Sequence, residues 1–161
     1  MLTLNAIKIK LKAWFAEHAQ INDVRYEDDF SFNAERNLSY PVTNIEFLDA
    51  AINNTYLNYN FKVSIGDMTD PNQPHQVDDV YSDSILVAED FFAYLQREEG
   101  WVFNKSTSIQ KFTDDTGDRV AGIVFRITLS VVRSQNTCAT PTKITEPPAE
   151  GLGGGDIITS I

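Results

Sequence analysis

The sequence predicts an α+β fold in which a mostly antiparallel sheet of about five strands packs against two helices. From Val77 to Leu95, apolar residues recur every three or four positions with acidic residues between them, which is typical of an amphipathic helix. The segments before and after this helix alternate apolar and polar residues, as strands with one buried face do. A sheet is therefore the expected cover for the apolar stripe of the helix, which consists of Val77, Tyr81, Ile85, Ala88, Phe92 and Leu95.

The chain begins with a second predicted helix, for which Thr3 supplies the N-cap. One face of this helix is apolar and carries Leu4, Ile7, Leu11, Trp14 and Phe15, with His18 at its edge. A histidine in that position is expected to be packed or tipped toward solvent, so we assign it no chemistry.

Three strands are expected next. The first lies between Ile21 and Phe32 and is followed by a loop over residues 33–37. Tyr40-Pro41 opens the second strand, Val42 to Leu48, because the residue before a proline avoids helical geometry. A turn over residues 49–54 then leads to the clearest strand, Tyr56 to Ile65, whose alternate residues are apolar.

A loop from Gly66 to Gln76 connects this strand to the central helix, because it is rich in prolines and turn-forming residues. Its aspartates, with those of the helix start, lack the ligand spacing of an EF-hand, so a solvated loop is the preferred interpretation over a cation site. The helix should end near residues 98–100, where Gly100 is expected to adopt the left-handed conformation.

A hairpin closes the predicted domain. Its first strand spans residues 101–112, its turn is Asp114 to Asp118, and its long return strand runs from Arg119 to Arg133. The aspartates of the turn are the usual residues of such turns, so they are not assigned to a metal. Residues 1–134 are thus predicted to form one domain and residues 135–161 an extended C-terminal arm, rich in proline and glycine, that is either a disordered end or a strand added to a neighbouring subunit.

The net charge of −10 argues against a protein that grips the phosphate backbone of DNA. An acidic surface past which DNA slides without adhering remains compatible with that charge. Cys138 is the only cysteine, which excludes an intrachain disulfide and a cysteine metal cage and favours a reducing compartment. No apolar run approaches the ~20 residues of a membrane span and no signal peptide is recognisable, so we expect a soluble, unsecreted protein without membrane contact.

No catalytic motif emerges. The chain has no glycine-rich phosphate loop, no G-x-S-x-G and no H-E-x-x-H, and its two histidines lie on different predicted elements. We therefore expect no enzyme, no cofactor and no metal. A carboxylate pair that forms only in three dimensions would leave an uncharacterised hydrolase as the lowest-ranked alternative.

Several local features resemble a group of small virion proteins of tailed phages. They are Tyr40-Pro41-Val42, the strand from Leu57 to Ile65 with Gly66-Asp67-Met68 after it, Val80-Tyr81-Ser82-Asp83-Ser84, and Asp118-Arg119-Val120-Ala121-Gly122 leading to Asn136-Thr137-Cys138. The chain looks most like neck and tail proteins of crAss-like phages of gut Bacteroides, and its order of elements is similar to that of tail terminator and tail-completion proteins. The resemblance covers about residues 2–138.

This resemblance implies a homo-oligomeric ring in the neck or tail of a virion, assembled in the host cytoplasm. Such a ring contacts the portal or adjacent ring proteins, joins head to tail and lines the channel through which genomic DNA passes non-specifically during ejection. The alternative within the same virion is a tail-tube or tail-hub subunit. We expect the connecting loop and the C-terminal arm to dock between subunits, with Asp67, Asp70, Pro71, Pro74, His75, Ile157, Ile158 and Ile161 as the interaction residues.

Overall fold

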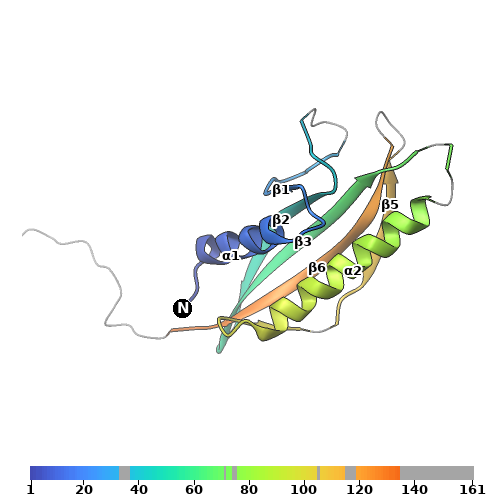
Figure 1. Cartoon of the computed structure of the whole chain (residues 1–161). Helices are drawn as coiled ribbons and strands as arrows, with labels where there is room; N and C mark the ends of the chain where they lie inside the picture. Colours follow the sequence, from blue (N-terminus) through green and yellow to red (C-terminus); the bar gives the residue numbers. More distant parts are fainter. Residues whose placement is uncertain (33–36, 71, 74–75, 105, 115–118, 135–161) are drawn as a thin grey trace, which may run out of the picture.

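The protein has a two-layer architecture in the computed structural model, which describes residues 1–32, 37–70, 72–73, 76–104, 106–114 and 119–134 (Figure 1). Within these ranges two helices, α1 (Leu4–Glu17) and α2 (Gln76–Arg97), lie on one face of a six-stranded sheet. The strands are β1 (Asp23–Arg25), β2 (Val42–Ile52), β3 (Tyr56–Met68), β4 (Val102–Phe103), β5 (Ile109–Asp114) and β6 (Val120–Val132). This arrangement confirms the α+β fold with a mostly antiparallel sheet.

The strand order is β1-β2-β3-β6-β4, and β5 also pairs with β6. β6 is the central strand because one of its edges pairs with β3 along its whole length while the other carries β4 and β5. β1 is the one strand that runs parallel to its neighbour, and it covers only residues 42–44 of β2. Beyond Asn44, no strand in the described ranges pairs with the outer edge of β2.

The main core lies between the helices and the sheet. Alternate residues of β3 and β6 form its floor, which confirms the faces expected for both strands: Tyr59, Phe61, Val63 and Ile65, with Ile123, Phe125, Ile127, Leu129 and Val131. Ile7, Leu11 and Phe15 enter it from α1, whose N-terminus is capped as predicted because the Ala6 N–H donates to Thr3 Oγ1 at 3.3 Å. The other face of the sheet is polar around the middle of β3, where Lys62 Nζ lies 2.7 Å from Glu46 Oε2.

The buried face of α2 differs from the predicted stripe. The side chains that α2 buries are Val80, Ser84, Val87, Ala88, Phe91 and Leu95. Ile85, a member of the predicted stripe, is 41% exposed. The helix is rotated because Phe91 packs against α1, with its ring centroid 4.6 Å from that of Phe15 and 5.1 Å from that of Trp14. A helix that packs on both a sheet and a second helix buries the stripe of residues that contacts both of them.

The strand predicted between Ile21 and Phe32 is only three residues long. After β1 the chain crosses to the far face of the sheet, where Phe32 forms a small second core with Val42 and Val120. Gly66 and Gly122 face each other in the β3–β6 ladder, and their lack of side chains allows Phe32 and the two strands to approach closely. A Cβ on Gly66 would lie 2.8 Å from Phe32 Cε1, and one on Gly122 would lie 1.9 Å from the Ile65 carbonyl oxygen.

Three predicted boundaries are also wrong. β2 continues to Ile52, because an irregularity between Phe47 and Asp49 shifts the register and lets pairing with β3 resume, so the turn is confined to residues 53–55. β3 extends past Ile65 to Met68, into the predicted loop. The single strand expected over residues 101–112 is split into β4 and β5.

The end of α2, at Arg97, agrees with the predicted end near residues 98–100. Gly100 lacks the left-handed conformation expected of it and instead allows close packing, since a Cβ there would lie 2.2 Å from Leu2 Cδ1. No helix in the described part of the chain is long and apolar enough to cross a lipid bilayer. The predicted arm, residues 135–161, lies outside the described residues, so the boundary near Ser134 stays a prediction.

Candidate binding pocket

A carboxylate occupies the last core-facing position of β3. Asp67 follows Val63 and Ile65 at intervals of two, so its side chain lies on the helix-covered face of the sheet, where it pairs in register with Ala121 of β6. The sequence predicted Asp67 to be a docking residue of a projecting loop. The structure places it in a strand, partly buried beneath the N-terminal half of α2, which corrects its placement in a loop and leaves its docking role a prediction.

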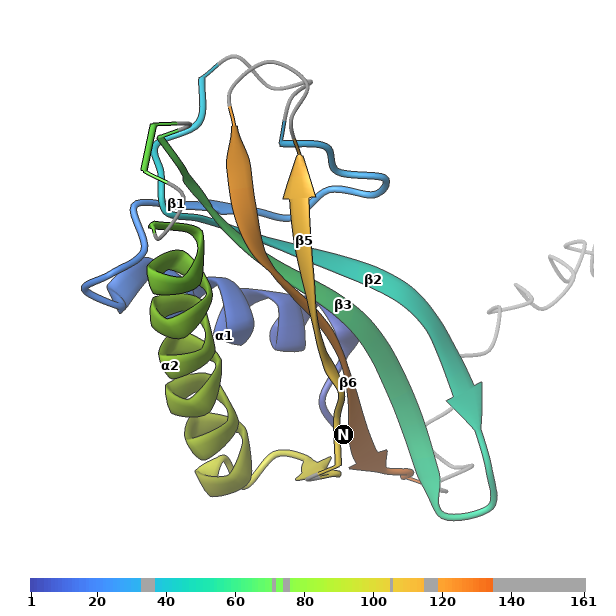
Figure 2. The same cartoon turned by 90° about the vertical axis from the view of Figure 1, so that its right-hand side faces the viewer.

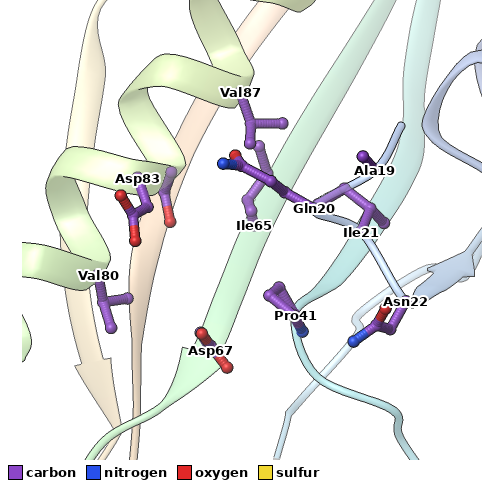
Figure 3. Close-up of a pocket in the computed structure, with 11 residues that line it drawn as sticks. Ala19, Gln20, Ile21, Asn22, Pro41, Ile65, Asp67, Val80, Asp83 and Val87 are labelled. Atoms are coloured by element: carbon purple, nitrogen blue, oxygen red, sulfur yellow. The ribbon is translucent and has the colours of Figure 1, made fainter.

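Asp67 lines a pocket of about 300 Å³ between α2, the end of β3 and the connection from α1 to β1. Figure 3 shows the labelled side chains around a central space, with Asp83 and Val80 on α2, Asp67 on β3, and Gln20, Asn22 and Pro41 on the other side. The complete lining is Ala19, Gln20, Ile21, Asn22, Pro41, Ile65, Asp67, Val80, Asp83, Ser84 and Val87. This volume lies at the lower end of the range for small-ligand pockets, so a compact group fits.

The pocket combines apolar walls with a concentration of negative charge. Burial raises the pKa of the Asp67 carboxyl above its ordinary value of 3.8, the Met68 N–H opposes this by donating to Asp67 Oδ1 at 2.8 Å, and the nearby Asp83 carboxylate raises the pKa further. Neither carboxylate forms an ion pair with a basic group in the described part of the chain. The two negative charges are thus close together without an internal counter-charge.

Ser84 adds a polar group to the same wall. The residue is 5% exposed, and its hydroxyl is not among the buried side-chain oxygens of the described residues that lack a hydrogen-bond partner. Ser84 thus lines the pocket without being an unpaired buried group.

The remaining acidic residues of this region have other surroundings. Asp70 follows β3 in an exposed turn, where its Oδ1 accepts from the Asn72 N–H at 2.9 Å and its own N–H donates to Gln76 Oε1 at 2.7 Å. Asp78 and Asp79 are exposed in the first turn of α2, where carboxylates complement the helix dipole. No group of three or more metal-ligating side chains occurs in the described ranges.

His18 is the C-cap of α1 and connects the two helices. Its Nε2 lies 3.2 Å from Asp90 Oδ2 on α2, and its Nδ1 accepts from the Gln20 N–H at 3.3 Å. The ring also packs on Trp14, at 5.1 Å between centroids. The histidine is thus held by packing and hydrogen bonds, as expected, and it positions the Gln20 wall of the pocket.

Of the predicted interaction residues, the structure describes Asp67 and Asp70 and brings only Asp67 to the pocket. Pro71, Pro74, His75, Ile157, Ile158 and Ile161 lie outside the described residues. The sequence analysis missed Asp83, Ser84, Gln20 and Asn22 as neighbours of Asp67. One signal was present, since Asp67 continues the alternation of the preceding strand and so extends its buried face by one position.

No model of a known protein family matches this chain, and no curated protein matches it. The chemistry of the pocket therefore rests on its own residues. The polar part of its lining consists of two carboxylates, one hydroxyl and two amide side chains, all of which can accept hydrogen bonds.

Proposed function

We propose that this chain is a structural virion protein that forms a homo-oligomeric ring in the neck or tail of a tailed phage, joins the head portal to the tail and lines the DNA exit channel. Its role is architectural, not catalytic. The observation that carries the assembly part of this proposal is a sheet with unpaired edges on two opposite sides.

The first free edge belongs to β2. From Ile45 to Ile52 its outer side faces no strand in the described ranges, and its last residues, Ala50 to Ile52, are exposed. Figure 2 shows the β2–β3 hairpin extending beyond the helices. Ile52, at the end of β2, is 68% exposed, and Val132 at the adjacent end of β6 is 60% exposed. An edge of this length with apolar ends favours pairing with another chain.

The second free edge belongs to β5, which pairs only with β6 in the part of the chain that the structure describes. Because the β2 and β5 edges are different surfaces, a contact between them joins subunits head to tail. Such heterologous contacts close into a ring when the rotation per subunit divides a full turn. Ring formation therefore requires no additional element beyond the sheet.

Two further properties support the proposal. The net charge of −10 suits a channel that repels the DNA passing through it. The placement in a phage neck or tail, with the portal or neighbouring ring proteins as partners, rests on the resemblance of short sequence segments. As part of the same proposal, the arm of residues 135–161 docks on a neighbouring subunit.

The mass of the full chain in solution tests the proposal, by native mass spectrometry and sedimentation over a range of concentrations. We expect a single closed multimer, and we expect Ala51→Lys to shift it toward monomer, because a lysine on an edge strand blocks pairing. Ser82→Lys, at an exposed site on α2, adds the same charge and is the matched control. A wild-type chain that stays monomeric throughout contradicts the proposal.

Deletion of residues 151–161 tests the docking of the arm. We expect the melting temperature of the isolated subunit to stay nearly unchanged while assembly weakens, because burial of Ile157, Ile158 and Ile161 on a neighbour would contribute about 1.5–3 kcal/mol each. If the truncated chain assembles normally, the arm has no part in the interface.

A further inference from the structure

We propose that residues 156–158 of a neighbouring subunit dock in a groove on the uncovered face of the sheet, with the Asp156 carboxylate at Arg126 and the Ile158 side chain beside Val124. This inference rests on the docking of the arm proposed above and names the surface that receives it. Deleting the arm tests whether it docks, whereas variants of the groove test where it docks.

The groove lies on the face of the sheet opposite to α1 and α2, which both pack on the other face (Figure 1). Lys62, Val124 and Arg126 alternate with the buried core residues of β3 and β6, so their side chains lie on this uncovered face. Two hollows of about 460 and 370 Å³ adjoin there, because both are lined by Lys62 and Val124. Together they form one groove with a polar part at Arg126 and an aromatic part at Phe112.

The polar part of the groove has an excess of positive charge in a protein whose net charge is −10. Lys62 and Arg126 lie opposite each other in the β3–β6 ladder, and like charges in that arrangement destabilise a sheet. Glu46 is buried, and its Oε2 lies 2.7 Å from Lys62 Nζ, so one of the two cations is neutralised. The Arg126 guanidinium has no ion pair within the described residues. A carboxylate from another chain supplies the counter-charge that Arg126 lacks.

The aromatic part of the groove offers a seat for an aliphatic side chain. The ring of Phe32 stacks on that of Phe112 at 5.2 Å between centroids and contacts that of Phe30 edge-on at 4.9 Å. Phe30, Phe112 and Val124 are only half-buried, although they line a hollow. An isoleucine side chain placed among them removes apolar surface from water on both partners, which favours docking.

The arm matches both parts of the groove in chemistry and in spacing. Arg126 and Val124 are two residues apart on one face of β6, which separates them by about 7 Å. Asp156 and Ile158 are also two residues apart, so an extended segment presents them on one side at the same spacing. Residues 135–155 precede this segment, and about twenty residues span up to roughly 70 Å when extended, which is enough to reach a neighbouring subunit.

Disulfide cross-linking of the full chain tests the proposal, in a Cys138→Ser background that removes the native thiol. Val124→Cys combined with Ile158→Cys should form cross-linked multimers under mild oxidation, resolved by mass on a non-reducing gel. Ser130→Cys combined with Ile158→Cys is the matched control, because Ser130 is half-buried on the same face of β6 but outside the groove. We expect the control pair to cross-link at least tenfold more slowly. Equal rates for the two pairs, or cross-links confined to single chains, overturn the proposal.

Charge reversal tests the contact between Arg126 and Asp156. Arg126→Glu should weaken assembly about tenfold in sedimentation, because two carboxylates then face each other, and adding Asp156→Arg should restore most of the loss. Arg119→Glu, at an exposed arginine outside the groove, makes the same change of charge and should leave assembly unchanged.

The outcomes separate this inference from the docking on which it rests. If deletion of residues 151–161 weakens assembly while Arg126→Glu behaves like Arg119→Glu, the arm docks elsewhere and only the groove assignment is overturned. If the deletion leaves assembly unchanged, both the docking and the groove assignment are overturned. Loss in Arg126→Glu without rescue by Asp156→Arg also overturns the pairing of these two residues.

Discussion

Replacing Phe91 on α2 by alanine should be among the most destabilising single substitutions in this protein. The Phe91 side chain is fully buried, and its ring lies 4.6 Å from that of Phe15 and 6.2 Å from that of Phe125 between centroids. Its removal opens a cavity where α1, α2 and β6 meet. Large-to-small changes of this kind cost about 3–5 kcal/mol, and the lost ring contacts place this one toward the upper end.

Ile85 on the same helix supplies the matched comparison, because its side chain is 41% exposed. We expect Ile85→Ala to cost less than about 1 kcal/mol, since substitutions away from the core usually have small effects. Urea unfolding followed by circular dichroism measures both values, and an unchanged m-value shows that the comparison is valid. Phe91→Leu, at about 1–2 kcal/mol, provides a milder variant if Phe91→Ala does not fold.

Which of Phe91→Ala and Ile85→Ala destabilises the protein more shows which face of α2 is buried. If Ile85→Ala destabilises the protein as much as Phe91→Ala does, then α2 packs with a different face against the sheet. Asp83 and Ser84 would then not line the pocket described above, because their positions depend on the rotation of α2.

Three further outcomes are expected. Asp67→Asn should raise the melting temperature at pH 7. Between pH 3.8 and the raised pKa of Asp67 the folded wild type binds more protons than the unfolded chain, so its stability falls as the pH rises through this range, and parallel pH profiles of variant and wild type would contradict this. Gly122→Ala should lower the free energy of unfolding in urea by about 1–3 kcal/mol, because the added Cβ lies 1.9 Å from the Ile65 carbonyl oxygen. Ser130→Ala on the same strand should be nearly neutral, and similar losses in the two variants would show that β3 and β6 separate freely. Duplex DNA should bind no better than it does to an unrelated acidic protein at physiological salt, and a salt-sensitive micromolar affinity in a filter-binding assay would refute this.

The long antiparallel pair β3–β6 was predictable because each strand carries apolar residues at every second position over most of its length. In β6 every second residue from Ala121 to Val131 is apolar and buried, and Val124 is the one apolar side chain on the opposite face within this range. A period-two pattern has only two possible faces, and one of them was clearly apolar. The N-cap of α1 was predictable for a similar reason, since it depends on one local hydrogen bond to Thr3.

The face of α2 could not be read with the same certainty, because two overlapping stripes of the helix are apolar. Phe91 and Phe92 are adjacent, and the choice between them depends on α1, which lies more than seventy residues earlier in the chain and presents Trp14 and Phe15. Contacts of this kind are tertiary and leave no periodic signal. The local pattern established that α2 is an amphipathic helix but not its rotation.

The pocket depends on the same kind of long-range information. Gly66 ahead of Asp67 indicated a turn, yet it lies within β3, where Phe32 fills the space that a side chain on Gly66 would need. Once the strand is extended by these residues, Asp67 falls on the buried face. Its proximity to Asp83 and Ser84 then follows from the packing of α2 on β3, which the sequence alone did not contain.

The measurement that tests the central claim most directly is electron cryomicroscopy of the purified full-length chain at the concentration where it assembles. The account predicts closed rings of identical subunits around an open channel, with neighbouring subunits in contact through the outer edges of β2 and β5. Particles that remain single subunits, open filaments, or closed particles without a channel would contradict it.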